Sequence, residues 1–275
     1  MNLQERDPAA SELFRRLHDG GLLVLVNAHD AGTARLVESL GAQAVATTSA
    51  GVAWSHGYPD GDALPLDLLV ATVLDIARSV RVPVSVDVEG GTSDDAEAVG
   101  EAVARLVEAG AAGINIEDGA GAPDVLASKI AAIKRTAARR GLDLFVNART
   151  DVYLRGLGPA ERRIDLTLAR AELYRAAGAD GLFVPGLVNA EDIQAIASTQ
   201  PLPLNVLARP GLPSARVLEE LGVRRLSAGA ALAEAAFARM SALAAAFLKN
   251  GESDALLKGA MAYADLNALM APRAR

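Results

Sequence analysis

The sequence predicts an α/β protein folded as a single (β/α)₈ TIM-type barrel, and three observations support this. Short β-branched and apolar runs alternate with longer stretches of helical spacing from end to end. About eight such units fit into 275 residues, close to the roughly 250 residues of one such barrel. Helix-to-strand corners repeat a small motif, as at Ala109-Gly110-Ala111, where glycine suits the left-handed end of a helix. Strict alternation implies a parallel sheet, and eight units favour its closure.

Each predicted strand is an apolar run bounded by Gly, Pro or Asp. In chain order the predicted strands are residues 22–27, 44–49, 83–88, 113–118, 144–150, 181–185, 203–208 and 225–228. The helices predicted between them, from apolar residues at helical spacing, include residues 66–80, 94–109, 123–140 and 160–177. Because no low-complexity linker interrupts this pattern, we expect residues 1–275 to form one domain.

The C-terminal segment, residues 229–275, differs from the barrel units. Residues 229–250 are alanine-rich and apolar on most faces, and a further helix is predicted over residues 253–271. A helix that is apolar all round must be covered by something. Two interpretations stay open from these residues alone: the segment is an oligomer interface, or it packs as the last helices of its own barrel.

Composition limits the partners and the compartment. The net charge of −7 and the pI near 5.1 disfavour nucleic acid and anionic membranes, since both require a basic face. The absence of cysteine excludes disulfides, thiolate metal sites and a cysteine nucleophile. Neither an apolar signal core at the N-terminus nor a charge-free apolar stretch of about 18 residues is evident, so we expect a cytoplasmic protein without a membrane span.

Carboxylates follow the predicted strands at the points where these strands end. The motif VSVDVEGG contains Asp87 and Glu89, and the motif GINIEDG contains Glu117. Alternation places Asp87 and Glu89 on the same side of their strand, and the carboxyl ends of barrel strands meet at one mouth. Mg²⁺ usually takes one or two carboxylates together with waters and substrate oxygens. These acids are therefore candidate metal ligands; the alternative is that they cap helices or are solvated loop charges.

Arg149, in the motif NARTD, ends the next predicted strand. An arginine there could hold a substrate carboxylate bidentately and neutralise charge on an enolate oxygen. The alternative is a structural ion pair with Glu117 or Asp151, and both roles can coexist.

The segment TTSAG, which contains Ser49, Ala50 and Gly51, follows the second predicted strand. Hydroxyls, small residues and backbone N–H groups after a strand can form a cradle for a carboxylate or phosphate, although an ordinary loop has the same composition. His29 and His56 are more typical of surface histidines than of acid–base groups. The glycine-rich pieces lack the G-x-G-x-x-G order, so NAD is not expected.

Taken in order, the motifs NAHDAGTAR, TTSAGVA, GYPD, VSVDVEGG, AGINIEDG and NARTD resemble those of the isocitrate lyase / phosphoenolpyruvate mutase superfamily. The match runs from Asn27 to Asp151 and continues more loosely through PLNVL and LSAG. The family fold is a (β/α)₈ barrel, commonly tetrameric, with the last helix exchanged between paired subunits. The resemblance therefore implies a homo-oligomer, a dimer or tetramer, in which residues 229–275 form a helix-swapped interface.

The resemblance also implies Mg²⁺-assisted chemistry, with Mn²⁺ as an alternative ion, on small 2-oxo or hydroxy acids through an enolate-like species. Asp87 would be the main metal ligand, with Glu89 and Glu117 acting directly or through water. The residues that the resemblance assigns are Asp87, Glu89 and Glu117 for the metal, Arg149, Asp60 and Glu117 for catalysis, and Ser49, Ala50, Gly51, Arg149 and Asn205 for the substrate.

Three departures separate the chain from the family pattern. Residues 119–128 form a short segment without the lid cysteine of the lyases, and Phe183-Val184-Pro185-Gly186 stands where the mutases place a histidine. Glu89 replaces a more usual Asp, which moves the carboxylate by roughly 1.5 Å, one C–C bond.

We therefore expect a Mg²⁺-dependent lyase that cleaves a C–C bond in a small 2-oxo or hydroxy dicarboxylate, in the manner of an oxaloacetate decarboxylase. The alternatives are C–P chemistry, as in a phosphonopyruvate hydrolase or a phosphoenolpyruvate mutase, and a non-catalytic barrel that binds small acids.

Overall fold

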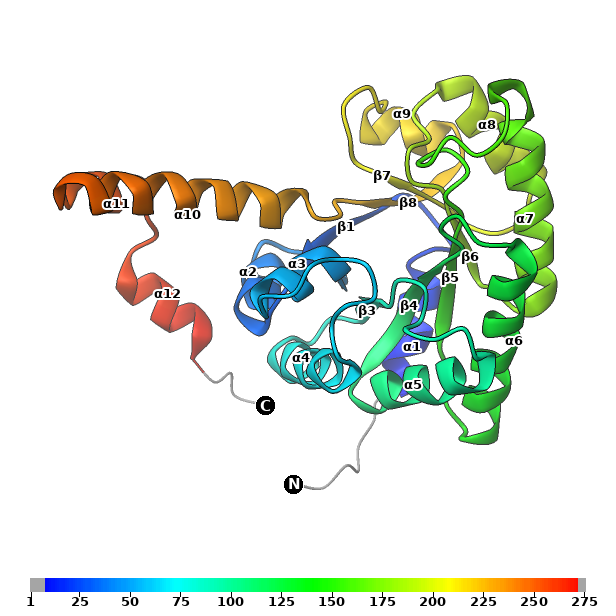
Figure 1. Cartoon of the computed structure of the whole chain (residues 1–275), viewed down its shortest axis with the longest axis horizontal. Helices are drawn as coiled ribbons and strands as arrows, with labels where there is room; N and C mark the ends of the chain where they lie inside the picture. Colours follow the sequence, from blue (N-terminus) through cyan, green and yellow to red (C-terminus); the bar gives the residue numbers. More distant parts are fainter. Residues whose placement is uncertain (1–7, 272–275) are drawn as a thin grey trace.

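The structure, a computed structural model, describes residues 8–271 and contains a closed barrel of eight parallel strands (Figure 1). Each strand pairs with the next one along the chain, and β1 also pairs with β8. The strands are β1 Leu23–Ala28, β2 Val45–Thr47, β3 Val84–Asp87, β4 Ala111–Glu117, β5 Phe145–Arg149, β6 Gly181–Phe183, β7 Leu204–Leu207 and β8 Val223–Ser227. The predicted (β/α)₈ fold is confirmed.

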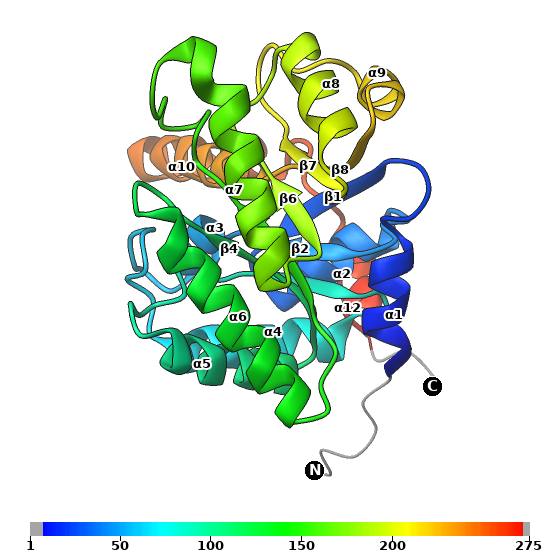
Figure 2. The same ribbon diagram turned by 90° about the vertical axis from the view of Figure 1, so that its right-hand side faces the viewer.

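Helices surround the barrel, as the view turned by 90° shows (Figure 2). They are α2 Ala31–Ser39, α4 Leu66–Ser79, α5 Ala96–Glu108, α6 Pro123–Arg139, α7 Arg163–Ala177, α8 Ala190–Thr199 and α9 Ala215–Glu220. Two further helical segments, α3 Ser49–Ser55 and the 3₁₀ turn Ala160–Arg162, lie in connections that follow strands β2 and β5.

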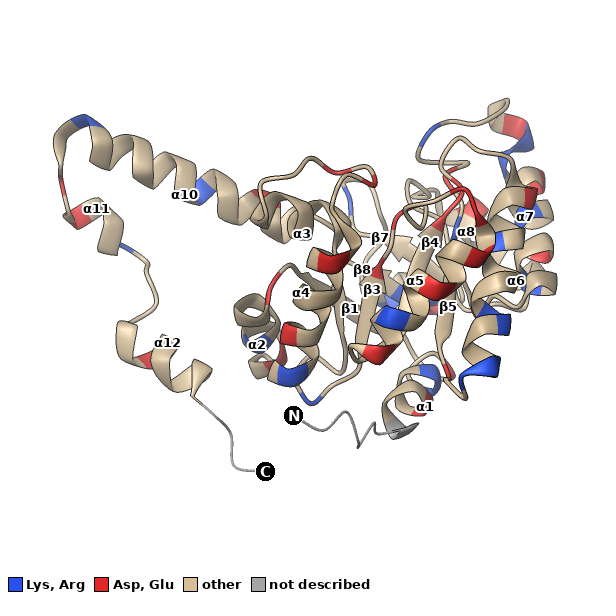
Figure 3. Ribbon diagram, turned by 60° about the horizontal axis from the view of Figure 1, so that its bottom comes forward, with Lys and Arg blue, Asp and Glu red and all other residues tan. Residues whose placement is uncertain are grey.

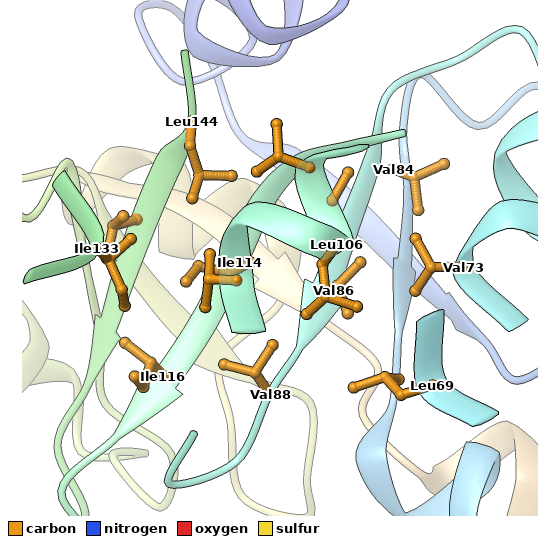
Figure 4. Close-up of a cluster of buried hydrophobic side chains, with 14 of the residues drawn as sticks. Leu69, Val73, Val84, Val86, Val88, Leu106, Ile114, Ile116, Ile133 and Leu144 are labelled. Carbon is orange, nitrogen blue, oxygen red and sulfur yellow. The ribbon is translucent and has the colours of Figure 1, made fainter. Parts of the chain in front are cut away.

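The outer faces of the strands pack against these helices in two clusters of buried apolar residues. The larger cluster joins β3, β4 and β5 to α4, α5 and α6, and includes Val86 and Ile114 (Figure 4). The smaller cluster joins β6, β7 and β8 to α8 and α9, and includes Leu182 and Ile196. Because side chains alternate along a strand, the outward orientation of Val86 leaves its neighbour Asp87 facing the barrel interior.

Helix α1, Pro8–Arg16, closes the end of the barrel at which the strands begin. Phe14 packs edge-on against Phe145, the first residue of β5, with ring centroids 5.5 Å apart. A β-carbon at Gly113 would lie 2.6 Å from Cε1 of Phe14, so glycine is required for this close contact. The plugged end leaves the opposite mouth, where the strands end, open for a site.

The C-terminal segment forms α10 Ala231–Asn250, α11 Asp254–Leu257 and α12 Tyr263–Met270. The prediction of a single helix over residues 253–271 is wrong. The helix is interrupted between α11 and α12, where Gly259 adopts a φ of +75°. Helix α12 returns to α2: the buried Arg35 donates hydrogen bonds to the carbonyl oxygens of Leu269 and Ala271. Figure 1 shows α10 extending away from the barrel.

Helix α10 is largely exposed and mostly apolar, with few charged residues along it (Figure 3). Its exposed side chains include Met240 and Leu248, the latter 85 % exposed. By length and composition alone this helix could cross a membrane: its most apolar window has a mean hydropathy of 1.5 and is 6 % buried. It is the one such helix among residues 8–271. Glu234 and Arg239 interrupt its apolar run, so the sequence contains no charge-free stretch that would predict it.

Candidate active site

Three neighbouring strands end in charged residues at the open mouth of the barrel. Asp87 ends β3, Glu117 ends β4 and Arg149 ends β5. In the ladder between β4 and β5, Glu117 pairs directly with Arg149, and in the ladder between β3 and β4, Asp87 pairs with Asn115. The sheet register therefore brings the predicted carboxylates and the predicted arginine to one edge.

Arg149 is held between two carboxylates. Its Nη1 lies 2.5 Å from Oε2 of Glu117, and its Nε and Nη2 donate to the two oxygens of Asp151 at 2.7 and 3.2 Å. The Arg149 side chain is 17 % exposed and the Asp151 side chain is fully buried. Burial alone would lower the pKa of Arg149, but Glu117 and Asp151 outweigh it and raise that pKa above its usual value. The guanidinium is thus a fixed cation whose plane is set by Asp151.

Asp87 is linked to the end of β2. Its backbone N–H donates to the hydroxyl of Thr47 at 2.9 Å, and the backbone N–H of Ser49 points to its Oδ2 at 3.4 Å. Burial raises the pKa of Asp87, and Arg149 and the Ser49 contacts oppose this effect. Ser49 therefore belongs to the same site, as a neighbour of the Asp87 carboxylate.

Glu89 lies two residues beyond β3 and has an unusual backbone conformation, with a φ of 51°. Asp62 and Thr92 share it, with φ values of 56° and 64°. The Asp62 N–H donates to Oε2 of Glu89, and the Thr92 N–H donates to Oδ1 of Asp62 at 3.1 Å. Left-handed backbone in residues other than glycine costs free energy and often marks functional sites. Here it interlocks two loops around Glu89.

The carboxyl groups at this mouth raise one another's pKa values. Burial raises the pKa of Glu117 to about 8; Arg149 opposes this effect, whereas Asp87, Asp151 and Glu89 add to it. Burial likewise raises the pKa of Glu89 to about 7, against the hydrogen bond from the Asp62 N–H, and Asp60, Asp62 and Asp87 add to the rise. Neighbouring carboxylates that are partly buried repel one another when ionised. A cation bound between them would supply the positive charge that stabilises their ionised forms.

This donor set fits a hard divalent cation. Within residues 8–271 no three His, Cys, Asp or Glu side chains already form a cage around a metal position. Mg²⁺ does not need such a cage, since it keeps several waters and takes one or two carboxylates with substrate oxygens. Asp87, at the base of the mouth, could be the direct ligand, and Glu89 and Glu117 could bind directly or through water. Glu89 and Glu117 also line an adjoining cavity of about 810 Å³.

The remaining predicted residues lie at different distances from this centre. Asp60 is exposed in the connection between α3 and α4, where its charge acts on Glu89. Ala50 and Gly51 are buried in the first turn of α3, which begins directly at Ser49, so the predicted loop is a short helix. A substrate role for these residues stays a prediction.

Asn205, also predicted to bind substrate, is fully buried inside the barrel. Its amide nitrogen donates to the carbonyl of Val206 and to the hydroxyl of Ser227, and its oxygen accepts from Asn147 at 3.0 Å. Asn147 also donates to Asn115 at 2.9 Å. The polar atoms of Asn205 are therefore engaged by the protein, and contact with a substrate stays a prediction.

Sequence reasoning missed a buried carboxylate that supports the site from behind. Asp118 accepts hydrogen bonds from Nη1 of Arg170 and the hydroxyl of Tyr174, both at 2.6 Å, and from the backbone N–H of Asp151 at 2.9 Å. It thereby ties α7 to the residue that orients Arg149. The signal in the sequence was the spacing of Arg170 and Tyr174, which puts two hydrogen-bond donors on one face of a helix.

Lys129 also has a supporting role. Its side chain is 8 % exposed, and its Nζ donates to the carbonyl of Gly90 at 2.8 Å. Gly90 follows Glu89, so Lys129 fastens the Glu89 loop to α6. His56, by contrast, contacts the hydroxyl of Thr72 at 2.9 Å, and His29 lies 3.8 Å from Asp30, so neither histidine has a contact with the carboxylates described above.

Known proteins resemble this chain over most of its length. The family model described as phosphoenolpyruvate phosphomutase matches residues 14–248. An uncharacterised protein of Mycobacterium tuberculosis is 38 % identical over 262 residues, which cover 93 % of this chain and 95 % of that protein. A Burkholderia cenocepacia crystal structure, provisionally named a lyase/mutase, is 36 % identical, with a TM-score of 0.86 and 96 % of both chains covered.

Relatives with named activities match over shorter stretches. An oxaloacetate decarboxylase of Bradyrhizobium is 31 % identical over 201 residues, which cover 69 % of this chain and 65 % of that enzyme. Enzymes named 2-methylisocitrate lyase and 2,3-dimethylmalate lyase also match. Members of this group of lyases and mutases are typically dependent on a divalent metal. The chain belongs to the phosphoenolpyruvate phosphomutase family, within the isocitrate lyase / phosphoenolpyruvate mutase superfamily.

Proposed function

We propose that the protein is a Mg²⁺-dependent lyase that cleaves a C–C bond in a small 2-oxo or hydroxy dicarboxylate, with oxaloacetate decarboxylation as the first candidate reaction. The observation that carries the proposal is the fixed Arg149 guanidinium, 2.5 Å from Glu117 at the edge that also holds Asp87. A cation next to a cluster of carboxylates is suited to hold a substrate carboxylate and a developing oxyanion together. The named activities of several relatives support the same class of reaction.

In the candidate reaction the C3–C4 bond of oxaloacetate breaks, CO₂ leaves, and the electron pair moves to the oxygen on C2. Mg²⁺, or Mn²⁺, held by Asp87 with Glu89 and Glu117, would polarise that oxygen as a Lewis acid. Arg149 donates hydrogen bonds to the C2 oxygen as negative charge develops on it, and Asp151 fixes the orientation of the donating guanidinium. The remaining step is protonation of C3, for which Asp60 is the acid–base candidate on the loop before α4.

The test measures pyruvate and CO₂ released from oxaloacetate by the purified protein. We expect turnover with Mg²⁺ or Mn²⁺ and its loss in EDTA, and a loss of at least 100-fold in kcat for Arg149→Met, since removing one oxyanion donor costs about 10²–10³ in rate. Undiminished turnover of Asp87→Ala, or turnover that EDTA does not affect, would refute the proposal.

Two rival functions predict different results in the same preparation. If the protein acts on C–P bonds, phosphonopyruvate rather than oxaloacetate is consumed; free phosphate then indicates a hydrolase and phosphoenolpyruvate a mutase. If it only binds small acids, 2-oxo acids raise its melting temperature without any product.

We also propose that residues 229–275 form an interface in a cytoplasmic homo-oligomer, a dimer or tetramer in which α10 packs against a second copy. The support is the exposure of α10, whose Phe237, Met240 and Phe247 side chains face solvent in a single chain. Light scattering coupled to size-exclusion chromatography tests this, and a monomer of 28.4 kDa would contradict it.

A further inference from the structure

Arg155 shares its carboxylate partner with Arg149. It lies four residues after Asp151 in the turn that follows β5, and its Nε donates to Oδ2 of Asp151 at 2.9 Å. Nη2 of Arg149 donates to the same oxygen at 3.2 Å. One fully buried carboxylate therefore positions two guanidinium groups side by side. Because both nitrogens contact the same atom, they are at most about 6 Å apart.

The two arginines differ in what their remaining donors do. Arg149 is 17 % exposed and uses its third nitrogen on Glu117. Arg155 is 50 % exposed, and its two terminal nitrogens have no acceptor among the residues that the structure describes. One of them lies 3.9 Å from the position of a β-carbon on Gly119, in the loop after β4. Arg155 thus has free donors beside a loop that contains no bulky side chain to cover them.

These free donors border the cavity that adjoins the candidate metal site. Arg155, Glu89, Glu117 and Gly119 all line this space of about 810 Å³. When Glu117 serves a divalent cation, Arg149, Asp151 and Arg155 together carry one net positive charge. Arg155 therefore adds a positive charge to the wall of a cavity that Glu89 and Glu117 also line.

The spacing suits a second anionic group on the substrate. Two carboxylate carbons separated by three C–C bonds of about 1.5 Å lie about 4 Å apart. A four-carbon 2-oxo diacid whose first carboxylate and 2-oxo oxygen face Arg149 can therefore bring its other end to the neighbouring guanidinium. Arginine binds carboxylate and phosphonate groups with the same pair of parallel hydrogen bonds.

We propose that Arg155 is the specificity-determining residue that binds the anionic group on carbon 3 of the substrate and selects 2-oxo diacids over 2-oxo monoacids. This rests on the proposed function, because it assumes that the reacting end of the substrate lies at Arg149. The same chemistry serves a carboxylate, as in oxaloacetate, or a phosphonate, as in phosphonopyruvate.

The test compares Arg155→Met with the wild-type protein and with Arg162→Met as a charge-matched control, since Arg162 pairs only loosely, at 3.5 Å, with Asp165 on the surface. Calorimetry in Mg²⁺ measures the affinities of three acids. Malate has a carboxylate on carbon 3, lactate lacks that carboxylate, and oxalate has no carbon 3 at all. We expect Arg155→Met to weaken malate ten- to a hundredfold and to leave oxalate and lactate within twofold. Arg155→Lys should recover part of the malate affinity, and Arg162→Met should behave as wild type.

Kinetics give an independent measure: Arg155→Met should raise KM for the turned-over diacid ten- to a hundredfold with kcat changed less than threefold. Equal weakening of oxalate and malate would overturn the proposal, because Arg155 would then act only through Asp151 and Arg149. Unchanged malate affinity would also overturn it. If the wild type binds malate better than lactate through Arg155 but turns over no acid, the specificity role stands and the proposed lyase function fails; if it binds none of the three acids, both fail.

Discussion

Replacing Asp118 by asparagine should destabilise the protein and disturb Arg149 without changing the volume of the side chain. The Asp118 side chain is fully buried, and three donors converge on it, from Arg170, Tyr174 and the backbone of Asp151. Asparagine keeps one oxygen, which can still accept from Asp151. Its NH₂ group faces the other two donors, and Arg170 has no lone pair with which to accept a hydrogen bond.

The magnitude follows from what Arg170 loses. Its side chain is 15 % exposed, so little water can replace the carboxylate. A hydrogen bond to a charged group contributes roughly 1.5–3 kcal/mol, and breaking a buried ion pair by removing one partner costs roughly 3–5 kcal/mol. We expect Asp118→Asn to lower the free energy of unfolding by about 3 kcal/mol, at the lower end because the Asp151 bond survives. For a chain of this size the melting temperature should then fall by about 6–12 °C.

The assay is urea unfolding of the wild type, Asp118→Asn, Arg170→Met and the double variant. We expect a coupling free energy of about 1.5–3 kcal/mol between the two positions. Glu172→Gln, which removes an exposed ion pair with Arg175 on the same helix, is the matched control and should have the wild-type free energy of unfolding. If Asp118→Asn unfolds within about 0.5 kcal/mol of the wild type, Asp118 does not clamp α7 to the site as argued.

Three further predictions concern other parts of the chain. His18 is 5 % exposed and stacks on Phe145, and burial lowers its pKa to about 4, so unfolding takes up a proton at His18 below pH 6.5. Between pH 7.5 and pH 5 the wild type should therefore lose about 2 kcal/mol of stability relative to His18→Phe in parallel urea titrations, because the raised pKa values of Glu89 and Glu117 act equally in both proteins. Thr92→Asn should raise the melting temperature by a few degrees, because a left-handed β-branched residue costs about 1–2 kcal/mol that asparagine reduces; an unchanged or lower temperature would contradict this. Arg35→Met should accelerate amide hydrogen exchange in α12 but not in α2, and equal rates in both proteins would show that Arg35 does not anchor α12.

The positions of the strands and of their terminal charges could be predicted because local signals determine them. A parallel strand buried on both faces is an uninterrupted apolar run, and its end is marked by a change to acid and glycine. Once β4 and β5 were identified as neighbours, the proximity of Glu117 and Arg149 followed from their order in the chain. The register that pairs these two residues directly confirms that inference.

Other features could not be predicted, because distant residues or backbone torsion determine them. Alternation predicts that Asp87 and Glu89 lie on the same side of one strand, but β3 ends at Asp87, and the φ of 51° at Glu89 is stabilised by the loop that contains Asp62. The partners of Asp118 come from α7, more than 50 positions along the chain. Helix α3 is only seven residues long, too short for apolar periodicity to reveal it.

The two apolar clusters outside the barrel have a consequence for how the protein unfolds. They meet on α7, where Tyr174 belongs to the larger cluster and Ala171 to the smaller one. Cooperative units in native-state hydrogen exchange tend to coincide with such contiguous packed regions. The sheet is a closed ring, but two separate apolar clusters pack against it. We therefore expect β6, β7 and β8 to unfold locally together with α8 and α9, while the amides of β2 to β5 stay protected from hydrogen exchange. Helix α7, which is hydrogen-bonded to Asp118, then lies at the boundary between the two units. The candidate active site, at the ends of β3, β4 and β5, belongs to the unit that we expect to be better protected.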